Sequence, residues 1–248
     1  MTKSILNTVM LFALVAMFGC KSSNSGTSGN DSLGNKESVK ETTYAVCLWD
    51  KVALKESPDA QGKWLASIAL GEKCTYLDQT KEDNTGTKTV TYYKIRLMDG
   101  KEGWAQSDLI SLDSKPAALT QDADIYSRPD LLTKTNRSFS KMDIVAVKST
   151  QNDFIEVIGK RKEGKWIESG WIKANNVSYA DVDIAVAKFA SKALMIEDKE
   201  KRIQALNDIV GNTDFGGSVF IDYLTNLATE GSKLEGEDVV PVDSLSEQ

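Results

Sequence analysis

The reactive side chains of this chain exclude most of the common catalytic and metal-binding arrangements. Its 248 residues include no histidine and only three cysteines, Cys20, Cys47 and Cys74. Ser–His–Asp catalysis, Cys–His catalysis and histidine-ligated zinc are therefore impossible. Carboxylate, tyrosine, lysine or lone-thiol chemistry remains, and acid–base work at neutral pH would need a group with a strongly shifted pKa. The sequence also has no glycine-rich phosphate loop and no calcium-loop spacing. We therefore expect a protein that is not an enzyme and has no cofactor or metal.

Cys20 follows a segment, residues 1–19, that has the features of an export signal. An uninterrupted apolar run covers residues 9–18. This run has about half the length needed to span a bilayer, so a membrane-spanning helix is not expected. The small residue followed by cysteine resembles the lipobox of bacterial lipoproteins, in which the cysteine is acylated and becomes the new N-terminus. Met17 and Phe18 depart from the usual motif.

The alternative is an ordinary secretory signal that ends near Gly19, and both interpretations take the mature protein out of the cytoplasm. Under the lipoprotein resemblance, Lys21 in place of aspartate implies sorting to the outer membrane. We therefore expect an exported protein that Cys20 anchors by its lipid to a bacterial membrane. Its orientation, periplasmic or surface-exposed, stays open.

The charge of the chain argues against a nucleic-acid partner. The net charge is −6, and six acids and one lysine lie in residues 230–248. The remainder of the mature chain is close to neutral, so its net charge provides no basic surface for a phosphate backbone.

The chain changes character at Tyr44. Residues 20–43 are rich in Ser, Gly, Asn, Lys and Glu. They carry too little apolar surface to fold, so we expect a lipidated flexible tether. From Tyr44 onward, short β-type runs alternate with turn signals, and the strand around residues 93–97 places Tyr93, Ile95 and Leu97 on one face. Several short strands with tight turns predict a small barrel or sandwich.

Landmarks of residues 44–113 recur in residues 117–178. The pairs are Ser57–Asp59 with Arg128–Asp130, and Gly103–Trp104 with Gly170–Trp171. Two units with the same ordered landmarks indicate a duplicated domain.

The order of these landmarks resembles that of bacterial Src-homology-3-like (SH3b) domains. The segments that carry the resemblance in the first unit are Val52–Pro58, Leu70–Lys73, Tyr93–Leu97, Asp99–Ala105 and Asp108–Ile110. In the second unit Arg128–Pro129 and Gly170–Ile172 fit, whereas Met142 replaces the turn glycine. The resemblance implies a mainly β protein with two tandem SH3-like barrels, at residues 44–113 and 117–178.

After Val177 the periodicity becomes helical, which predicts a short α-helical module over residues 179–230. The expected helices begin at Ser178–Asp181 and cover Lys199–Val210 and Ser218–Thr229. In the first of these helices, Val182, Val186, Phe189, Ala190, Ala193 and Leu194 form one apolar stripe. Such short helices must pack together or onto the second barrel. Residues 231–248 are expected to be an acidic, disordered tail.

Cys47 and Cys74 have two interpretations. In an exported protein they could form a disulfide. The positions that match them in the second unit are Ala118 and Val145, which also suits two buried thiols.

Three aromatic residues are candidates for ligand binding. Alternation turns Tyr92 outward, and together with Trp49 or Trp64 it could line a shallow groove for a peptide or a glycan. Isolated exposed aromatic residues would look the same in sequence. Trp104 and Trp171 are expected to belong to the core rather than to a ligand site.

The basic run Lys160–Lys165 is expected to be a solvated hairpin loop. Its alternative role is contact with an anionic envelope polymer or with lipid headgroups.

These patterns together predict a non-catalytic lipoprotein of the cell envelope. The family resemblance implies peptidoglycan or a peptide segment of an envelope protein as its partner, and the fold alone does not choose between them. The alternative is a surface-exposed lipoprotein that binds external or host macromolecules.

Overall fold

A computed structural model describes residues 43–162 and 164–233 of the chain. The predicted signal at residues 1–19, the lipidation at Cys20, the tether up to residue 42 and the acidic tail beyond residue 233 lie outside the described residues.

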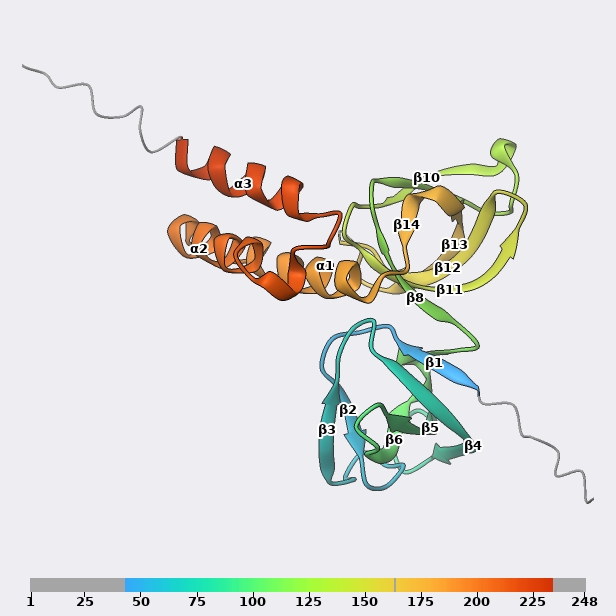
Figure 1. The fold of residues 1–248 in the computed structure, drawn as a ribbon. Helices are drawn as coiled ribbons and strands as arrows, with labels where there is room; N and C mark the ends of the chain where they lie inside the picture. The colour runs from blue at the N-terminus through green and yellow to red at the C-terminus, as the bar shows by residue number, and fades with distance from the viewer. Residues whose placement is uncertain (1–42, 163, 234–248) are drawn as a thin grey trace, which may run out of the picture. The chain divides into compact units, whose positions relative to one another are not determined.

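The described part of the chain is mainly β, with two seven-stranded antiparallel sheets followed by three α-helices (Figure 1). The first sheet contains β1 (Tyr44–Cys47), β2 (Val52–Lys55), β3 (Trp64–Ile68), β4 (Lys73–Asp83), β5 (Val90–Leu97), β6 (Glu102–Gln106) and β7 (Ile110–Leu112). The second contains β8 (Lys115–Leu119), β9 (Ala123–Tyr126), β10 (Lys134–Phe139), β11 (Ile144–Gln151), β12 (Phe154–Lys160), β13 (Ile167–Lys173) and β14 (Val177–Ser178).

The two sheets have the same topology, strand for strand. The first has the order β3-β2-β6-β5-β4-β1-β7 and the second the order β10-β9-β13-β12-β11-β8-β14. Adding seven to each strand number of the first sheet gives the order of the second. The duplication predicted from the sequence is therefore confirmed at the level of topology.

The repeated Gly–Trp pair has a steric reason in each sheet. A Cβ atom on Gly103 in β6 would lie 2.6 Å from the carbonyl oxygen of Lys55 and 2.8 Å from Cγ of Leu54, both in β2. On Gly170 in β13 it would collide with Cγ2 of Ile125 in β9. Because β2 and β9 hold equivalent places, only glycine lets these strands cross so closely.

The other landmarks also repeat their local structure. The Asp59 carboxylate accepts a hydrogen bond from the backbone N–H of Gln61, and Asp130 accepts one from Leu132 in the same way. Gly71 and Met142 both have left-handed backbones, with φ of +77° and +69°. Met142 thus adopts the conformation of the glycine that it replaces, at a cost in backbone strain.

Each sheet encloses its own apolar core. The first core contains Cys47, Leu54, Ile68, Cys74, Ile95, Leu97 and Ala105, and the second contains Leu119, Ile125, Phe139, Ile155, Val157 and Ile172. Trp104 is buried in the first sheet and Trp171 is half-buried in the second. The prediction that Tyr93, Ile95 and Leu97 share the inward face of β5 is confirmed.

The helices α1 (Asp181–Leu194), α2 (Lys199–Val210) and α3 (Ile221–Lys233) share a third core with the second sheet. Its members include Ile184, Ala187, Leu206, Phe220 and Leu224 from the helical region, with Met142 and Ile144 from the sheet side. Of the two predicted arrangements, the helices therefore adopt both, because they pack on one another and on the second sheet. The buried Asp183 fixes this docking, since it accepts hydrogen bonds from Oγ of Ser178 (2.5 Å) and the backbone N–H of Val219 (2.9 Å).

The predicted apolar stripe of the first helix is partly wrong. Phe189 is 47% exposed, whereas Ile184, which the stripe omits, is buried. Because α1 contacts the second sheet as well as α2 and η4 (Thr213–Phe215), its buried face is wider than one stripe. The third helix begins at Ile221 rather than Ser218, because Ser218–Phe220 form the turn that precedes it.

The two sheets meet in a small apolar seam. Val46, which lies in β1, and Leu48, which lies in the loop after β1, pack against Ala146 of β11. The turn at Gly71 lies against the second sheet and α1, since a Cβ atom there would be 2.9 Å from Cγ2 of Ile144 and 3.2 Å from Cγ2 of Ile184.

We predict that Gly103→Ala destabilises the protein by about 1–3 kcal/mol, because the added methyl group overpacks the contact with β2. The measurement is the urea unfolding midpoint of the full chain. Gly217→Ala is the control, because no atom lies within 4 Å of a Cβ atom at that position. Equal midpoints for the two variants would contradict this account of the Gly–Trp landmark.

Candidate functional site

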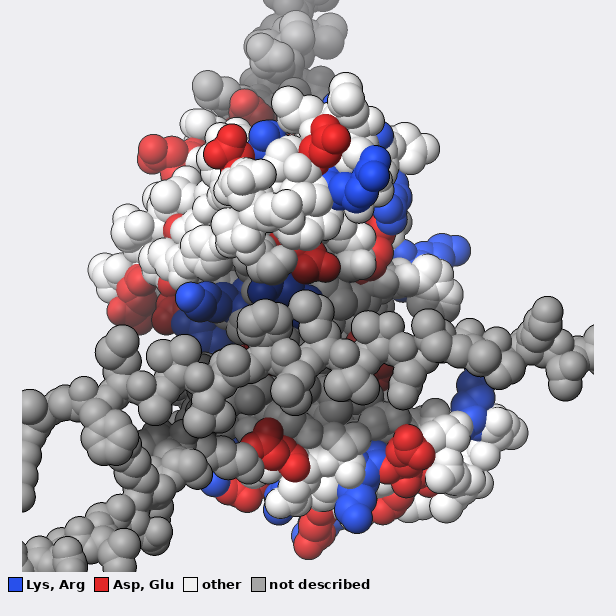
Figure 2. All heavy atoms as spheres, turned by 90° about the vertical axis from the view of Figure 1, so that its right-hand side faces the viewer, with Lys and Arg blue, Asp and Glu red and all other residues white. Residues whose placement is uncertain are grey.

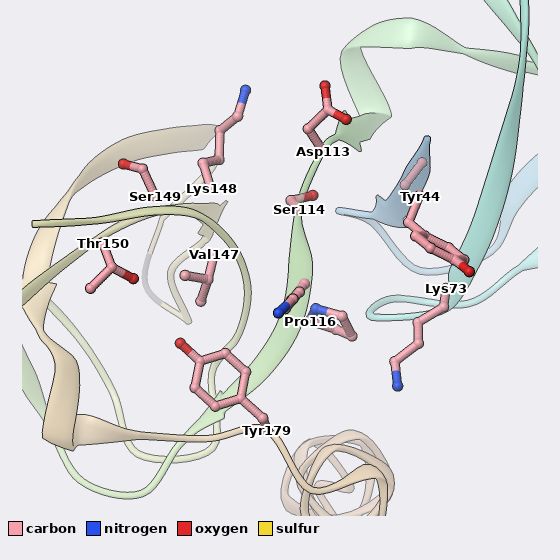
Figure 3. A pocket seen from close by; sticks show the side chains of 12 residues that line it. Tyr44, Lys73, Asp113, Ser114, Pro116, Val147, Lys148, Ser149, Thr150 and Tyr179 are labelled. Carbon is pink, nitrogen blue, oxygen red and sulfur yellow. The ribbon is translucent and has the colours of Figure 1, made fainter. Parts of the chain in front are cut away.

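A cavity lies where the two sheets are joined, and we call it the tyrosine cleft. Its volume is about 790 Å³. Its lining residues are Tyr44, Ala45, Lys73, Asp113, Ser114, Lys115, Pro116, Val147, Lys148, Ser149, Thr150 and Tyr179 (Figure 3). The volume is within the range of about 300–1,000 Å³ that is typical of ligand sites.

The two tyrosines come from distant parts of the sequence. Tyr44 opens β1, and alternation turns its ring away from the core that holds Ala45. Tyr179 follows β14 and precedes α1. Their side chains are 62% and 46% exposed, and they lie on either side of the segment that carries Ser114 and Pro116 (Figure 3). Two amphipathic rings therefore flank the segment that forms the floor of the cleft.

The floor between the tyrosines is fixed by hydrogen bonds of the segment between the sheets. The backbone N–H of Asp113 donates to the carbonyl oxygen of Tyr44 at 2.9 Å. Oγ of Ser114 donates to the carbonyl oxygen of Ser111 at 2.8 Å. Asp113 has a left-handed backbone, with φ of +50°, which aspartate tolerates better than most residues. The segment is therefore held in one conformation.

Positive side chains dominate the polar part of the cleft. Lys73, Lys115 and Lys148 line it, with Asp113 as the only carboxylate among the described lining residues. Lys73 forms an ion pair at 2.6 Å with Asp181, a residue outside the lining, and both side chains are well exposed. Such an exposed pair contributes little and can exchange for a ligand. The cleft thus favours an anionic group beside its aromatic rings.

This local excess does not belong to a broad basic surface. On the face shown in Figure 2, lysine and arginine are interspersed with aspartate and glutamate. Any recognition of anions on that face must therefore arise from individual sites rather than from one extended field.

The described lining residues include one carboxylate, that of Asp113, and neither cysteine lines the cleft. Burial raises the pKa of the Tyr179 hydroxyl, which keeps it protonated and able to donate a hydrogen bond. The arrangement is suited to binding.

The three aromatic residues predicted as a groove do not come together. Tyr92 is 2% exposed, so the prediction that its ring faces solvent is wrong. Its ring does point away from the inward face of β5, but β5 is the central strand of its sheet, and the ring is buried on that other face, where Arg96 is exposed. Trp49 is half-buried and lines a second, smaller cavity, whereas Trp64, 61% exposed on the terminal strand β3, lines neither cavity.

Sequence reasoning missed both tyrosines of the cleft. Tyr44 was assigned only to a strand, and Tyr179 only to the start of a helix. A weak signal existed for each, since both are aromatic residues at the edge of an element rather than within its apolar pattern. Nothing in their spacing, 135 positions apart, indicates that they share a cavity.

Cys47 and Cys74 are free, buried thiols in the first core, so the disulfide considered above is not formed and the core-thiol interpretation is correct. Sγ of Cys47 donates to the carbonyl oxygen of Trp49 at 3.1 Å, and Sγ of Cys74 to that of Ala45 at 3.6 Å. Burial raises the pKa of each thiol to about 12.

Two comparisons of the chain with known proteins find nothing: no protein-family model matches, and no curated protein matches. Among solved structures, the chain is similar to NlpC2 from Trichomonas vaginalis, with 12% identity and a TM-score of 0.24, over 69% of this chain and 57% of that one. The chain is also similar to NlpC1 from Trichomonas vaginalis, with 13% identity and a TM-score of 0.23, over 63% of this chain and 55% of that one. A third similar structure is the endolysin LysPBC5 CBD, with 15% identity and a TM-score of 0.21, over 56% of this chain and 95% of that one. The chain thus spans little more than half of the two NlpC structures, and at these TM-scores the likenesses decide neither fold nor function.

Neither a membrane-spanning helix nor a metal site is found among the described residues. No helix among them is long and apolar enough to cross a membrane. No group of three or more histidine, cysteine, aspartate or glutamate side chains among them is placed to hold a metal ion.

We predict that two thiols beyond Cys20 react with a thiol reagent only after denaturation. With a pKa of about 12, each buried thiol is ionised at pH 8 to a fraction on the order of 10⁻⁴. The measurement is the reagent titration of the full chain before and after addition of guanidinium. An unchanged thiol count after denaturation would mean that Cys47 and Cys74 are oxidised to a disulfide.

Proposed function

We propose that this protein is a non-catalytic lipoprotein of the cell envelope that binds peptidoglycan in the tyrosine cleft. The observation that carries the proposal is the position of two exposed tyrosine rings beside three lysines in one cavity of about 790 Å³. In this proposal each seven-stranded sheet is an SH3-like domain, and the cleft is made by the pair rather than by either one.

The rings account for the sugar part of such a ligand. Tyrosine offers a flat apolar face to the C–H face of a sugar ring and a hydroxyl to its polar edge. Tyr44 and Tyr179 flank the floor of the cleft, and the exposed side chains of Ser149 and Thr150 add hydroxyl groups to its wall. A glycan segment can therefore lie between the two rings.

The lysines account for the peptide part. Peptidoglycan carries stem peptides with free carboxylates, which form charge-assisted hydrogen bonds with ammonium groups. Lys73, Lys115 and Lys148 are placed to receive them. A neutral glycan would leave Lys115 and Lys148 without an ion-pair partner among the described residues, so the cleft fits a glycan that bears peptides better than a plain polysaccharide.

The expected N-terminal anchor suits the same function. Acylation at Cys20 and a flexible tether of residues 20–43 would hold the cleft near a membrane and allow it to reach the wall. For a Gly/Ser-rich coil of this length the typical reach is roughly 25 Å. An outer-membrane lipoprotein that faces the periplasm would meet peptidoglycan at this distance.

We predict that the full chain co-sediments with purified peptidoglycan and that Tyr44→Ala and Tyr179→Ala each weaken this binding about tenfold, as expected for loss of an aromatic contact. Trp64→Ala is the matched control, because Trp64 is as exposed as Tyr44 (61% and 62%) and lies outside the cleft. Added salt should weaken the binding through the lysines.

Three results would change the proposal. Binding lost with Trp64→Ala but kept with both tyrosine variants would retain the ligand and discard the cleft. Saturable binding to an envelope peptide without sugar would favour the protein-partner alternative. Absence of saturable binding to peptidoglycan would contradict the proposal and favour external or host macromolecules as the partner.

A further inference from the structure

A second cavity, which we call the lysine pocket, lies between the loop after β1, the second sheet and α1. Its volume is about 260 Å³. Its cationic lining residues are Lys141, Lys160, Arg161, Lys162, Lys188 and Lys192, against two acidic residues, Asp50 and Asp143. A chain with a net charge of −6 thus concentrates positive charge in one small cavity.

These cations come from three separate segments. Lys141 lies in the turn between β10 and β11, and the run Lys160–Lys162 ends β12 and begins the following loop. Lys188 and Lys192 are four residues apart on α1 and therefore share one face of that helix. The predicted solvated hairpin loop is thus one wall of a pocket rather than an isolated basic run.

Internal partners neutralise only part of this charge. Lys192 pairs with Asp50 at 3.0 Å, and Arg161 pairs with Glu168 at 2.5 Å. Lys162 and Lys188 form no ion pair with a described acidic residue. Like charges held close together destabilise a fold, so an excess of six cationic over two acidic side chains around one cavity favours a ligand that supplies further negative charge.

Two further cations are held by aromatic rings. The ammonium of Lys141 lies 3.8 Å from the ring centroid of Tyr223, and that of Lys160 lies 4.5 Å from that of Trp49. A cation over a ring keeps its full charge and its donors for an anion. Asp143 forms no ion pair with either ammonium group, and its carboxylate accepts hydrogen bonds from the backbone N–H groups of Ser140 and Lys162.

The floor of the pocket is apolar. Leu48, Leu70, Met142, Ile144 and Leu194 line it beside the cationic rim. An inorganic anion would use the rim and leave this floor uncovered. An ester whose organic part covers the floor would use both, with the hydrophobic gain that burial of apolar surface brings.

We propose that the lysine pocket binds a phosphate ester, with the phosphate among Lys141, Lys160, Lys162 and Lys188 and the organic part on the apolar floor. A phosphate has several oxygens and up to two charges to share among point-charge ammonium groups from different directions. A carboxylate would suit the planar fork of arginine, but Arg161 is already engaged by Glu168. The ester can be a lipid headgroup or a soluble molecule.

The test is calorimetric titration of the full chain with inorganic phosphate and with glycerol 3-phosphate. The ester should bind saturably and more tightly than inorganic phosphate. Lys162→Gln combined with Lys188→Gln should weaken binding of the ester about tenfold, since two charged contacts are removed. Lys81→Gln combined with Lys88→Gln is the control, because it removes the same charge from exposed positions outside both cavities and should change the affinity less than about twofold.

Two vesicle preparations separate the sources of the phosphate. Binding to vesicles of phosphatidylcholine with phosphatidylglycerol, but not to phosphatidylcholine alone, that the pocket variant weakens would support a lipid headgroup. Binding of glycerol 3-phosphate without this vesicle binding would support a soluble ester. No saturable binding to either, or equal weakening by the control variant, would overturn the proposal. Lys162 and Lys188 lie outside the tyrosine cleft, so the same variant should bind peptidoglycan as the unchanged chain does. This measurement distinguishes a failure of the phosphate-ester proposal from a failure of the peptidoglycan proposal.

Discussion

The short connection between β7 and β8 is the constraint on which the arrangement of sites depends. The first sheet ends at Leu112 and the second begins at Lys115, so two residues separate them. The Cα atoms of Leu112 and Lys115 are therefore at most about 11 Å apart, which forces the two sheets to lie close together. β1 pairs with β7 and β8 pairs with β14, and β1 is accordingly found in contact with β8. The tyrosine cleft lies directly on this connection, and the lysine pocket lies along the same junction of the first sheet with the second sheet and α1.

The architecture was largely predictable because its landmarks are local. Gly103 and Gly170 mark places where a strand leaves no space for a Cβ atom, and Asp59 and Asp130 close the same turn by bonding a backbone N–H two residues ahead. Each of these requirements favours one residue type at its position, so the same residue is found there in both units. Met142 is the exception, because its backbone is left-handed although methionine seldom adopts that conformation, so the sequence did not indicate the turn there.

The sites were poorly predictable because they depend on burial and on distant contacts. Alternation correctly placed Tyr92 outside the first core, but it could not show that the ring is buried on the other face of this central strand. The choice between a disulfide and free thiols for Cys47 and Cys74 also depended on tertiary geometry. Tyr44 and Tyr179 line one cavity only because the first and second sheets are in contact, which no local sequence pattern indicates. The sequence likewise did not show that the basic run at Lys160 lines the same pocket as Lys188 of α1.

The central claim is that the junction of the two sheets, rather than either sheet alone, binds a peptide-bearing glycan. The most direct measurement is the amide chemical-shift change of the isotope-labelled full chain on addition of a soluble muropeptide. The account predicts that the largest changes cluster at Tyr44, Asp113–Lys115, Lys148–Thr150 and Tyr179. Changes confined to one sheet away from the junction, for example around Trp64, would contradict it.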